Sequence, residues 1–187
     1  MQDIPDEIHR ILIDASKETI YTTGEIPRPQ VHMFAEDMPD QYIGWVSCRA
    51  FYRGHDAVTA IGDLGVLASV MKMTRLMVLW ESCDLATALD RGEGPFPRGL
   101  MLVDASLERH TLHQYPFETV PTGRVVDGVP TIRLQWETPR CSDGARLPDP
   151  IVRLLRTWRE LRDGDLQETA IGLQRSGYEL NWAERIA

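Results

Sequence analysis

Two short runs of apolar residues constrain the fold of this chain more than any other feature. They span residues 76–80 and 100–103, and neither run alternates with polar residues. A strand with one face in water alternates apolar and polar side chains, whereas a strand covered on both faces is apolar throughout. We therefore expect both runs to be central strands of a sheet that is covered on both faces.

A strand, a helix and a second strand are predicted between residues 42 and 80. Bulky apolar residues mark 42–51 as a strand, and Asp56 is a suitable N-cap for a helix that ends near Met71. Strand, helix and strand at this spacing predict a βαβ unit, in which the strands containing Val46 and Val78 are parallel. If the short predicted helix 85–90 is also a crossover, the strand 100–103 is parallel to them.

The second half of the chain predicts an antiparallel extension followed by two helices. Asp127-Gly128 is a strong two-residue hairpin turn, and apolar and polar side chains alternate after it. Apolar stripes with a period of about 3.6 residues predict helices over 151–161, 166–176 and, earlier, 5–21. The predicted fold is α/β with a mixed sheet: parallel central strands with a βαβ unit, an antiparallel hairpin extension and two C-terminal helices. We expect one domain over residues 1–187.

Composition and charge limit the classes of partner. Of the 187 residues, 43% are hydrophobic and 26% are charged, which is ordinary for a globular protein. The formal net charge is −8, which disfavours direct binding to nucleic acid because such binding needs a basic surface. The first residues are acidic where a signal peptide would be basic, and the apolar runs are far shorter than a membrane span. These features predict a cytoplasmic protein that does not enter a membrane.

Polar residues follow the ends of the predicted parallel strands, where ligands of such sheets usually bind. In chain order they are Arg49, Arg53 and His55, then Glu81 and Asp84, then Asp104. Hard divalent cations prefer carboxylate oxygens, so Glu81, Asp84 and Asp104 together could hold Mg²⁺ or Mn²⁺. With His55 beside a metal-activated water, this alternative is a divalent-metal-dependent hydrolase, such as a phosphodiesterase or a nuclease.

A structural role explains the same acids without any chemistry. Asp84 is a suitable helix N-cap, and Glu81 could form an ion pair with Arg49 or Arg75. The three acids also converge only if the strand that ends at Asp104 is parallel to its neighbour. Motifs for a serine nucleophile, a zinc protease, a phosphate loop or a dinucleotide site do not occur in the sequence. The lack of a catalytic motif favours a non-catalytic protein, and the metal-dependent hydrolase stays the alternative.

The C-terminal tail, residues 178–187, is unusually apolar for a chain end. Tyr178 and Trp182 are side chains of the type that dominates protein interfaces. Chain ends usually fray, so we expect this tail to dock on its own domain or on a neighbour. The preferred function is a non-catalytic interaction, assembly or regulatory protein that needs no cofactor. Its partner would be another protein or a second copy, contacted through the hairpin, the tail, Arg49 and Arg53.

Overall fold

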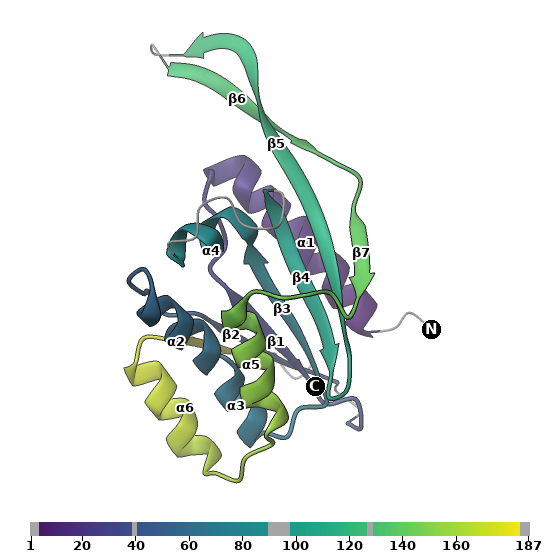
Figure 1. Cartoon of the computed structure of the whole chain (residues 1–187), viewed down its shortest axis with the longest axis vertical. Helices are drawn as coiled ribbons and strands as arrows, with labels where there is room; N and C mark the ends of the chain where they lie inside the picture. The colour runs from purple at the N-terminus through teal and green to yellow at the C-terminus, as the bar shows by residue number, and fades with distance from the viewer. Residues whose placement is uncertain (1–3, 39–40, 90–97, 127–128, 184–187) are drawn as a thin grey trace.

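An eight-stranded sheet organises the chain (Figure 1). The structure is a computed structural model that describes residues 4–38, 41–89, 98–126 and 129–183. The strand order is β6-β5-β4-β3-β1-β2-β8, with β7 paired to β5, and each of these pairings is antiparallel. The strands are β1 (Gln30–Phe34), β2 (Tyr42–Ser47), β3 (Arg75–Glu81), β4 (Gly99–Ser106), β5 (His110–Val126), β6 (Val129–Trp136), β7 (Arg140–Asp143) and β8 (Glu179–Trp182).

The predicted parallel centre is wrong, because β1 lies between the two strands of the predicted βαβ unit. Val31 of β1 pairs with Val46 of β2 on one side and with Val78 of β3 on the other. Both pairings are antiparallel, so β2 and β3 run in the same direction without being neighbours. The sequence indicates a strand near residues 30–35, but its insertion between β2 and β3 depends on contacts between segments far apart in the chain.

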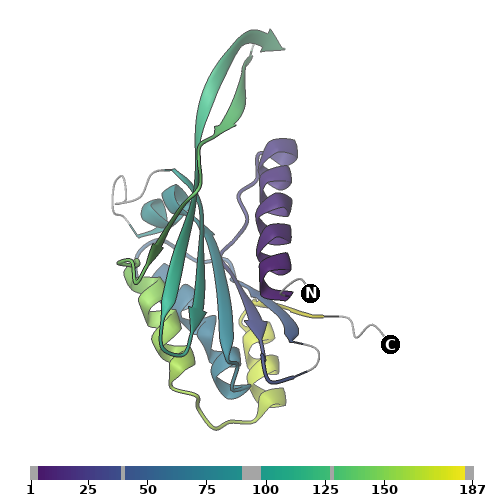
Figure 2. The same cartoon turned by 90° about the vertical axis from the view of Figure 1, so that its right-hand side faces the viewer.

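Strand β4 is antiparallel to β3, which also corrects the prediction. Val78 pairs with Val103, and Glu81 at the end of β3 pairs with Leu100 near the start of β4. The short helix α4 (Ser82–Ala88) is therefore part of a return connection and not a crossover. Both apolar runs are nevertheless buried, because helices cover both faces of the sheet (Figure 2). Continuous apolar character thus indicates burial on two faces and not strand direction.

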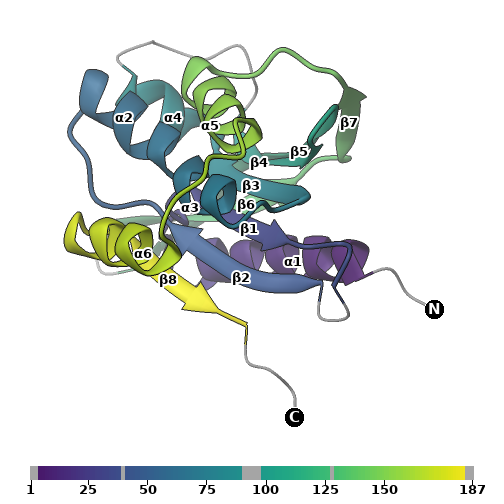
Figure 3. The same ribbon diagram turned by 90° about the horizontal axis from the view of Figure 1, so that it is seen from below.

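One face of the sheet carries a layer of helices above the larger hydrophobic core (Figure 2, Figure 3). The single helix predicted over 57–71 is two helices that meet at Leu64, and α3 packs against α5. This approach needs Gly65, since a Cβ there would lie 2.4 Å from the Leu154 carbonyl oxygen. The predicted C-terminal helices are present as α5 and α6. The layer consists of α2 (His55–Asp63), α3 (Gly65–Val70), α5 (Asp149–Arg159) and α6 (Leu166–Arg175).

The helix α1 (Ile4–Thr23) covers the opposite face (Figure 2). Its buried Ile13 joins a second core, whose sheet residues are Phe34, Met77, Leu79 and Leu102. About two turns further along, Ile20 packs with Leu100 and Phe117. A membrane-spanning helix would need a longer apolar stretch than any helix in the described ranges provides. The extent of the domain, residues 1–187, stays a prediction.

Candidate functional site

The β5–β6 hairpin projects from the sheet as a two-stranded ribbon (Figure 1, Figure 2). β5 pairs with β4 only as far as Pro116, which lies opposite Gly99. From Phe117 onward its partner is β6, and this pairing continues to Val126 opposite Val129. We call residues 118–126 and 129–135 the ribbon. The predicted hairpin therefore exists, although its Asp127-Gly128 turn lies outside the described residues.

The base of the ribbon is firmly anchored on the sheet and on α1. Phe117 is 2% exposed, and its ring centroid lies 4.8 Å from that of Trp136. The Lys17 ammonium of α1 lies 5.0 Å from the Trp136 ring centroid and 5.4 Å from the Tyr115 ring centroid. Glu118, the next residue of β5, is already exposed. On β5 the ribbon thus loses its apolar support immediately beyond Phe117, whereas on β6 Leu134 still packs on the base.

The ribbon offers an open strand edge to solvent. β6 is the last strand in the sheet order, so its outer edge meets no other strand within the described ranges. Free N–H and C=O groups on such an edge are a template for pairing with another chain. A two-stranded hairpin without further support is at best marginally stable in water. The exposed side chains near the base are mostly polar, as Glu118, Thr119, Arg133 and Gln135 show.

The apolar tail docks on the chain's own sheet. Residues Glu179–Trp182 form β8, in which Leu180 pairs with Val46 of β2. Tyr178 is 4% exposed, its hydroxyl donates to the Ala60 carbonyl oxygen at 2.9 Å, and burial raises its pKa to about 12. Tyr178 therefore anchors β8 to the helical layer. Trp182 is 47% exposed, so binding through its side chain stays a prediction.

The three acids of the predicted metal site are not brought together. Glu81 pairs with Leu100, whereas Asp104 pairs with Met77 toward the other end of the same two strands. Glu81 is 2% exposed and caps α4, accepting from the Asp84 main-chain N–H at 2.6 Å and the Gly99 N–H at 3.2 Å. The helix N-cap is therefore Glu81 and not Asp84. Within the described ranges, no three His, Cys, Asp or Glu side chains are placed to hold a metal ion.

Arg49 and Asp56, which follow β2, form an ion pair with a structural role. Two guanidinium nitrogens of Arg49 lie 2.5 and 3.2 Å from the Asp56 carboxylate, which also accepts from the Tyr52 main-chain N–H at 2.8 Å. These hydrogen bonds, that of Arg49 first, lower the pKa of Asp56 to about 2. The pair therefore fixes the loop before α2. His55 and Arg53 are exposed beside it, and their predicted roles stay predictions.

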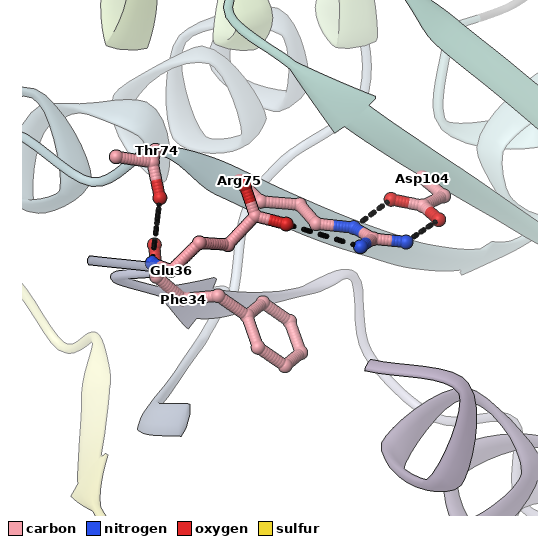
Figure 4. A network of polar contacts seen from close by, with 5 residues as sticks. All are labelled: Phe34, Glu36, Thr74, Arg75 and Asp104. Atoms are coloured by element: carbon pink, nitrogen blue, oxygen red, sulfur yellow. Dashed lines mark hydrogen bonds and ion pairs between the residues drawn. The ribbon is translucent and has the colours of Figure 1, made fainter. Parts of the chain in front are cut away.

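A groove beside the turn between β4 and β5 was not predicted from the sequence. It has a volume of about 1050 Å³, and Arg75, Asp104 and Glu36 line it (Figure 4). Nε and Nη2 of Arg75 donate to the two carboxylate oxygens of Asp104 at 2.8 and 2.6 Å, and Nη1 donates to Glu36 at 3.2 Å. The Thr74 hydroxyl accepts from the Glu36 main-chain N–H at 2.9 Å. Arg75 is therefore neutralised by Asp104 and Glu36, and Asp104 is committed to Arg75.

Two histidines meet on the α1 face of the sheet. Nε2 of His9 lies 2.7 Å from the Tyr115 hydroxyl oxygen, and the His9 and His113 rings are edge to face with centroids 4.6 Å apart. Partial burial is the main cause that lowers the pKa of both rings, and for His9 the neighbouring His113 lowers it further. Both groups are therefore held as neutral rings that pack and hydrogen-bond between α1 and β5.

Sequence periodicity contains little signal for these polar groups. Arg75 and Asp104 are 29 residues apart and meet only because β3 and β4 are antiparallel. His9 could have been noticed between Ile8 and Leu12, two residues of the α1 stripe that pack on the second core.

Comparisons with known protein families, curated proteins and solved structures found no match for this chain. Function is therefore inferred from the geometry of the chain itself.

Proposed function

We propose that this protein is a non-catalytic assembly protein that binds through the β5–β6 ribbon. The observation that carries the proposal is the contrast at Phe117: the strand is buried or half-buried up to this residue, and its side chains become largely exposed beyond it. Ordering a solvated two-stranded extension costs conformational entropy that its few internal contacts recover poorly. A partner that covers the ribbon would supply the missing support. The acidic chain is better suited to a protein partner than to nucleic acid, and we propose a cytoplasmic location.

A second copy of the chain is the partner that we propose. In a twofold-symmetric dimer both subunits present the same surface, and a strand edge that meets its own copy across such an axis pairs antiparallel. Two β6 edges would then join the two ribbons into a four-stranded sheet. That arrangement satisfies the free edge of β6 and gives each ribbon a third strand, the number at which small sheets become independently stable.

The charges near the ribbon base are compatible with self-association. Glu118 and Glu137 are balanced by Arg133 and Arg140, and the Arg140 guanidinium lies 3.4 Å from the Glu137 carboxylate. Two copies of a balanced surface do not repel each other strongly, despite the net charge of −8 on each chain. The remaining charges are screened beyond about 8 Å at physiological ionic strength.

Sedimentation velocity on a ribbon-shortened variant tests the proposal. Thr119 and Leu134 are opposite each other, so residues 120–133 can be replaced by Asn-Gly, a good two-residue hairpin turn. We expect the full chain to sediment as a concentration-dependent dimer. The shortened chain should sediment as a monomer that unfolds cooperatively at a melting temperature independent of concentration. Arg175→Gln, at the end of α6, is the matched surface control and should associate like the full chain. A full chain that stays monomeric, or a shortened chain that still associates, overturns the proposal.

A further inference from the structure

A second hollow lies between α5, the loop before it and the start of β5. It has a volume of about 450 Å³, which is within the usual range for small-molecule sites. Its charged lining consists of Arg146, Arg156 and Arg159 against one carboxylate, Asp149. Three cations around one hollow are notable in a chain whose net charge is −8. The local field therefore favours an anion.

Two arginines of this hollow have no counter-ion among the described residues. Within the described residues, the Arg146 and Arg156 side chains form neither an ion pair nor a hydrogen bond, and both are exposed at the rim. Five arginines elsewhere are neutralised by a neighbouring carboxylate, namely Arg28, Arg49, Arg75, Arg140 and Arg162. Others, such as Arg53 and Arg175, form no ion pair among the described residues but do not line this hollow. The hollow thus collects guanidinium groups that the described chain leaves available.

Arg159 is held in place by carbonyl oxygens and not by a counter-ion. Its Nη2 donates to the Ser106 carbonyl oxygen at 2.9 Å and to that of Arg109 at 3.2 Å. Its Nε is buried and has no hydrogen-bond partner among the described residues. Partial burial lowers the pKa of Arg159, in keeping with a cation that lacks nearby negative charge. A partly buried cation without a counter-ion is unfavourable, and an anion in the hollow would relieve it.

The rest of the lining is apolar. Leu147 and Leu155 are 6% and 2% exposed and form the base, while Val152 is 48% exposed on the first turns of α5. His110 shapes the neighbouring loop, because its Nε2 lies 2.9 Å from the Ala145 carbonyl oxygen. An inorganic anion would use the arginines but leave this apolar wall in water. A ligand that uses both surfaces carries one negative group and an apolar body.

We propose that this hollow binds a small organic carboxylate with an apolar body, such as a medium-chain fatty acid. The planar guanidinium groups of Arg146 and Arg156 are suited to a carboxylate, which they can bind through two parallel hydrogen bonds. Arg159 adds positive charge from a fixed position behind them. The apolar body lies along Val152 and Leu155. The site is independent of the ribbon and therefore of the proposed self-association.

Calorimetry with octanoate tests the ligand class. Two comparison compounds separate its parts: acetate has the charge without the apolar body, and 1-octanol has the apolar body without the charge. We expect saturable, one-to-one octanoate binding and at least tenfold weaker binding of each comparison compound. Octanoate that shows no saturable binding, or octanol or acetate that binds equally well, overturns the proposal.

Paired substitutions test the location. The double variant Arg146→Gln/Arg156→Gln keeps hydrogen-bonding side chains but removes both rim charges. It should weaken octanoate binding by at least about tenfold, since losing one charge-assisted hydrogen bond lowers an affinity by about that factor. Arg175→Gln, on α6 outside this lining, is the matched control and should bind octanoate like the unmodified chain. Val152→Asn should weaken octanoate binding while leaving the weak acetate binding unchanged. Binding that survives the double substitution places the ligand elsewhere and contradicts the assignment.

Discussion

The two halves of β5 are one continuous strand in two different environments. In the first half, residues 110–116, the strand lies between β4 and β7, and Leu112 is fully buried under the helical layer. In the second half, beyond Phe117, the strand pairs with β6 and its described side chains are largely exposed. The boundary coincides with the last residue that packs on Ile20 of α1. Strand formation itself does not change there.

The difference between these halves shows what stabilises this fold. Backbone pairing continues past Phe117, but the first half of β5 pairs on both edges and the second half on one edge, with a register shift between Pro121 and Val125. Burial distinguishes the two halves more strongly, because a net intramolecular hydrogen bond contributes about 1 kcal/mol whereas burying one leucine contributes about 2 kcal/mol. The sheet with its helices supports itself, and the ribbon depends on a surface that the chain does not supply. Four predictions test this contrast, beginning with the largest effect.

Truncating one leucine in each environment should give very different losses of stability. Leu112→Ala removes a fully buried side chain from the main core and should lower the free energy of unfolding by about 2–5 kcal/mol. Leu134→Ala, on β6 beside the ribbon base, removes a half-buried side chain and should cost less than about 1 kcal/mol. Urea denaturation of the two variants measures both values. Equal losses would show that the ribbon is as well supported as the sheet.

Removing one charge from the sheet and one from beside the ribbon base should give a smaller difference in the loss of stability. Asp104→Asn removes the carboxylate that binds Arg75 through two hydrogen bonds, and both side chains of this pair are only about one-fifth exposed. We expect a loss of about 1–3 kcal/mol, because the shielded guanidinium then keeps only the more exposed Glu36 as its counter-ion. Glu137→Gln breaks the exposed pair with Arg140 and should cost less than about 0.5 kcal/mol. If urea denaturation gives the two variants the same stability, the shielded pair contributes no more than the exposed one, and the prediction is wrong.

The helices could be predicted from the sequence more closely than the sheet. The predicted helix 5–21 is observed as Ile4–Thr23, because an apolar stripe is a local pattern that a single element must satisfy. Strand order is not local, since the position of β1 between β2 and β3 depends on which distant edges fit together. The apolar runs of β3 and β4 correctly indicated burial on two faces. They could not indicate direction, because antiparallel strands between two helical layers have the same composition.

The polar groups of the site were less predictable for the same reason. Glu81 and Asp84 were predicted to bind a cation together with Asp104, yet they meet each other at the start of α4, where Glu81 caps the helix. Asp104 was predicted to be a metal ligand because it follows an apolar run, but its partner Arg75 becomes visible only with the β3–β4 register. The arginine hollow joins β5, α5 and the loop before it, so no single segment contains its signal.

Lowering the pH should destabilise the fold, because His32 in the sheet takes up a proton when the chain unfolds. The ribbon should contribute nothing to this pH dependence. His32 stacks between Tyr42 and Trp45, and burial lowers its pKa to about 3. Because this folded-state pKa lies below the unfolded value of about 6.5, the unfolded chain binds more protons, and stability falls as the pH decreases below 6.5. The loss should be about 1.4 kcal/mol at about pH 5.5, with His9 and His113 adding in the same direction.

Urea denaturation between about pH 7.5 and about pH 5 measures this slope, in a window above the range where Asp56 takes up its proton. His32→Gln lacks the titrating group and should flatten the slope, whatever its effect on stability at neutral pH. The ribbon-shortened chain serves as the control and should keep the slope of the full chain. A slope that His32→Gln leaves unchanged would mean that the pH dependence comes from other groups.

The smallest effect is expected at the other edge of the sheet, and it decides which edge is the contact surface. Trp182 lies on β8, 47% exposed, and pairs through its backbone with Gly44 of β2. Trp182→Ala should lower the free energy of unfolding by less than about 1 kcal/mol, because the side chain is half in water and the backbone pairing remains. If the ribbon is the contact, this variant should sediment with the same association constant as the full chain. A monomeric Trp182→Ala chain would instead assign the interface to β8, with the aromatic side chain as its anchor. The ribbon would then have no demonstrated role.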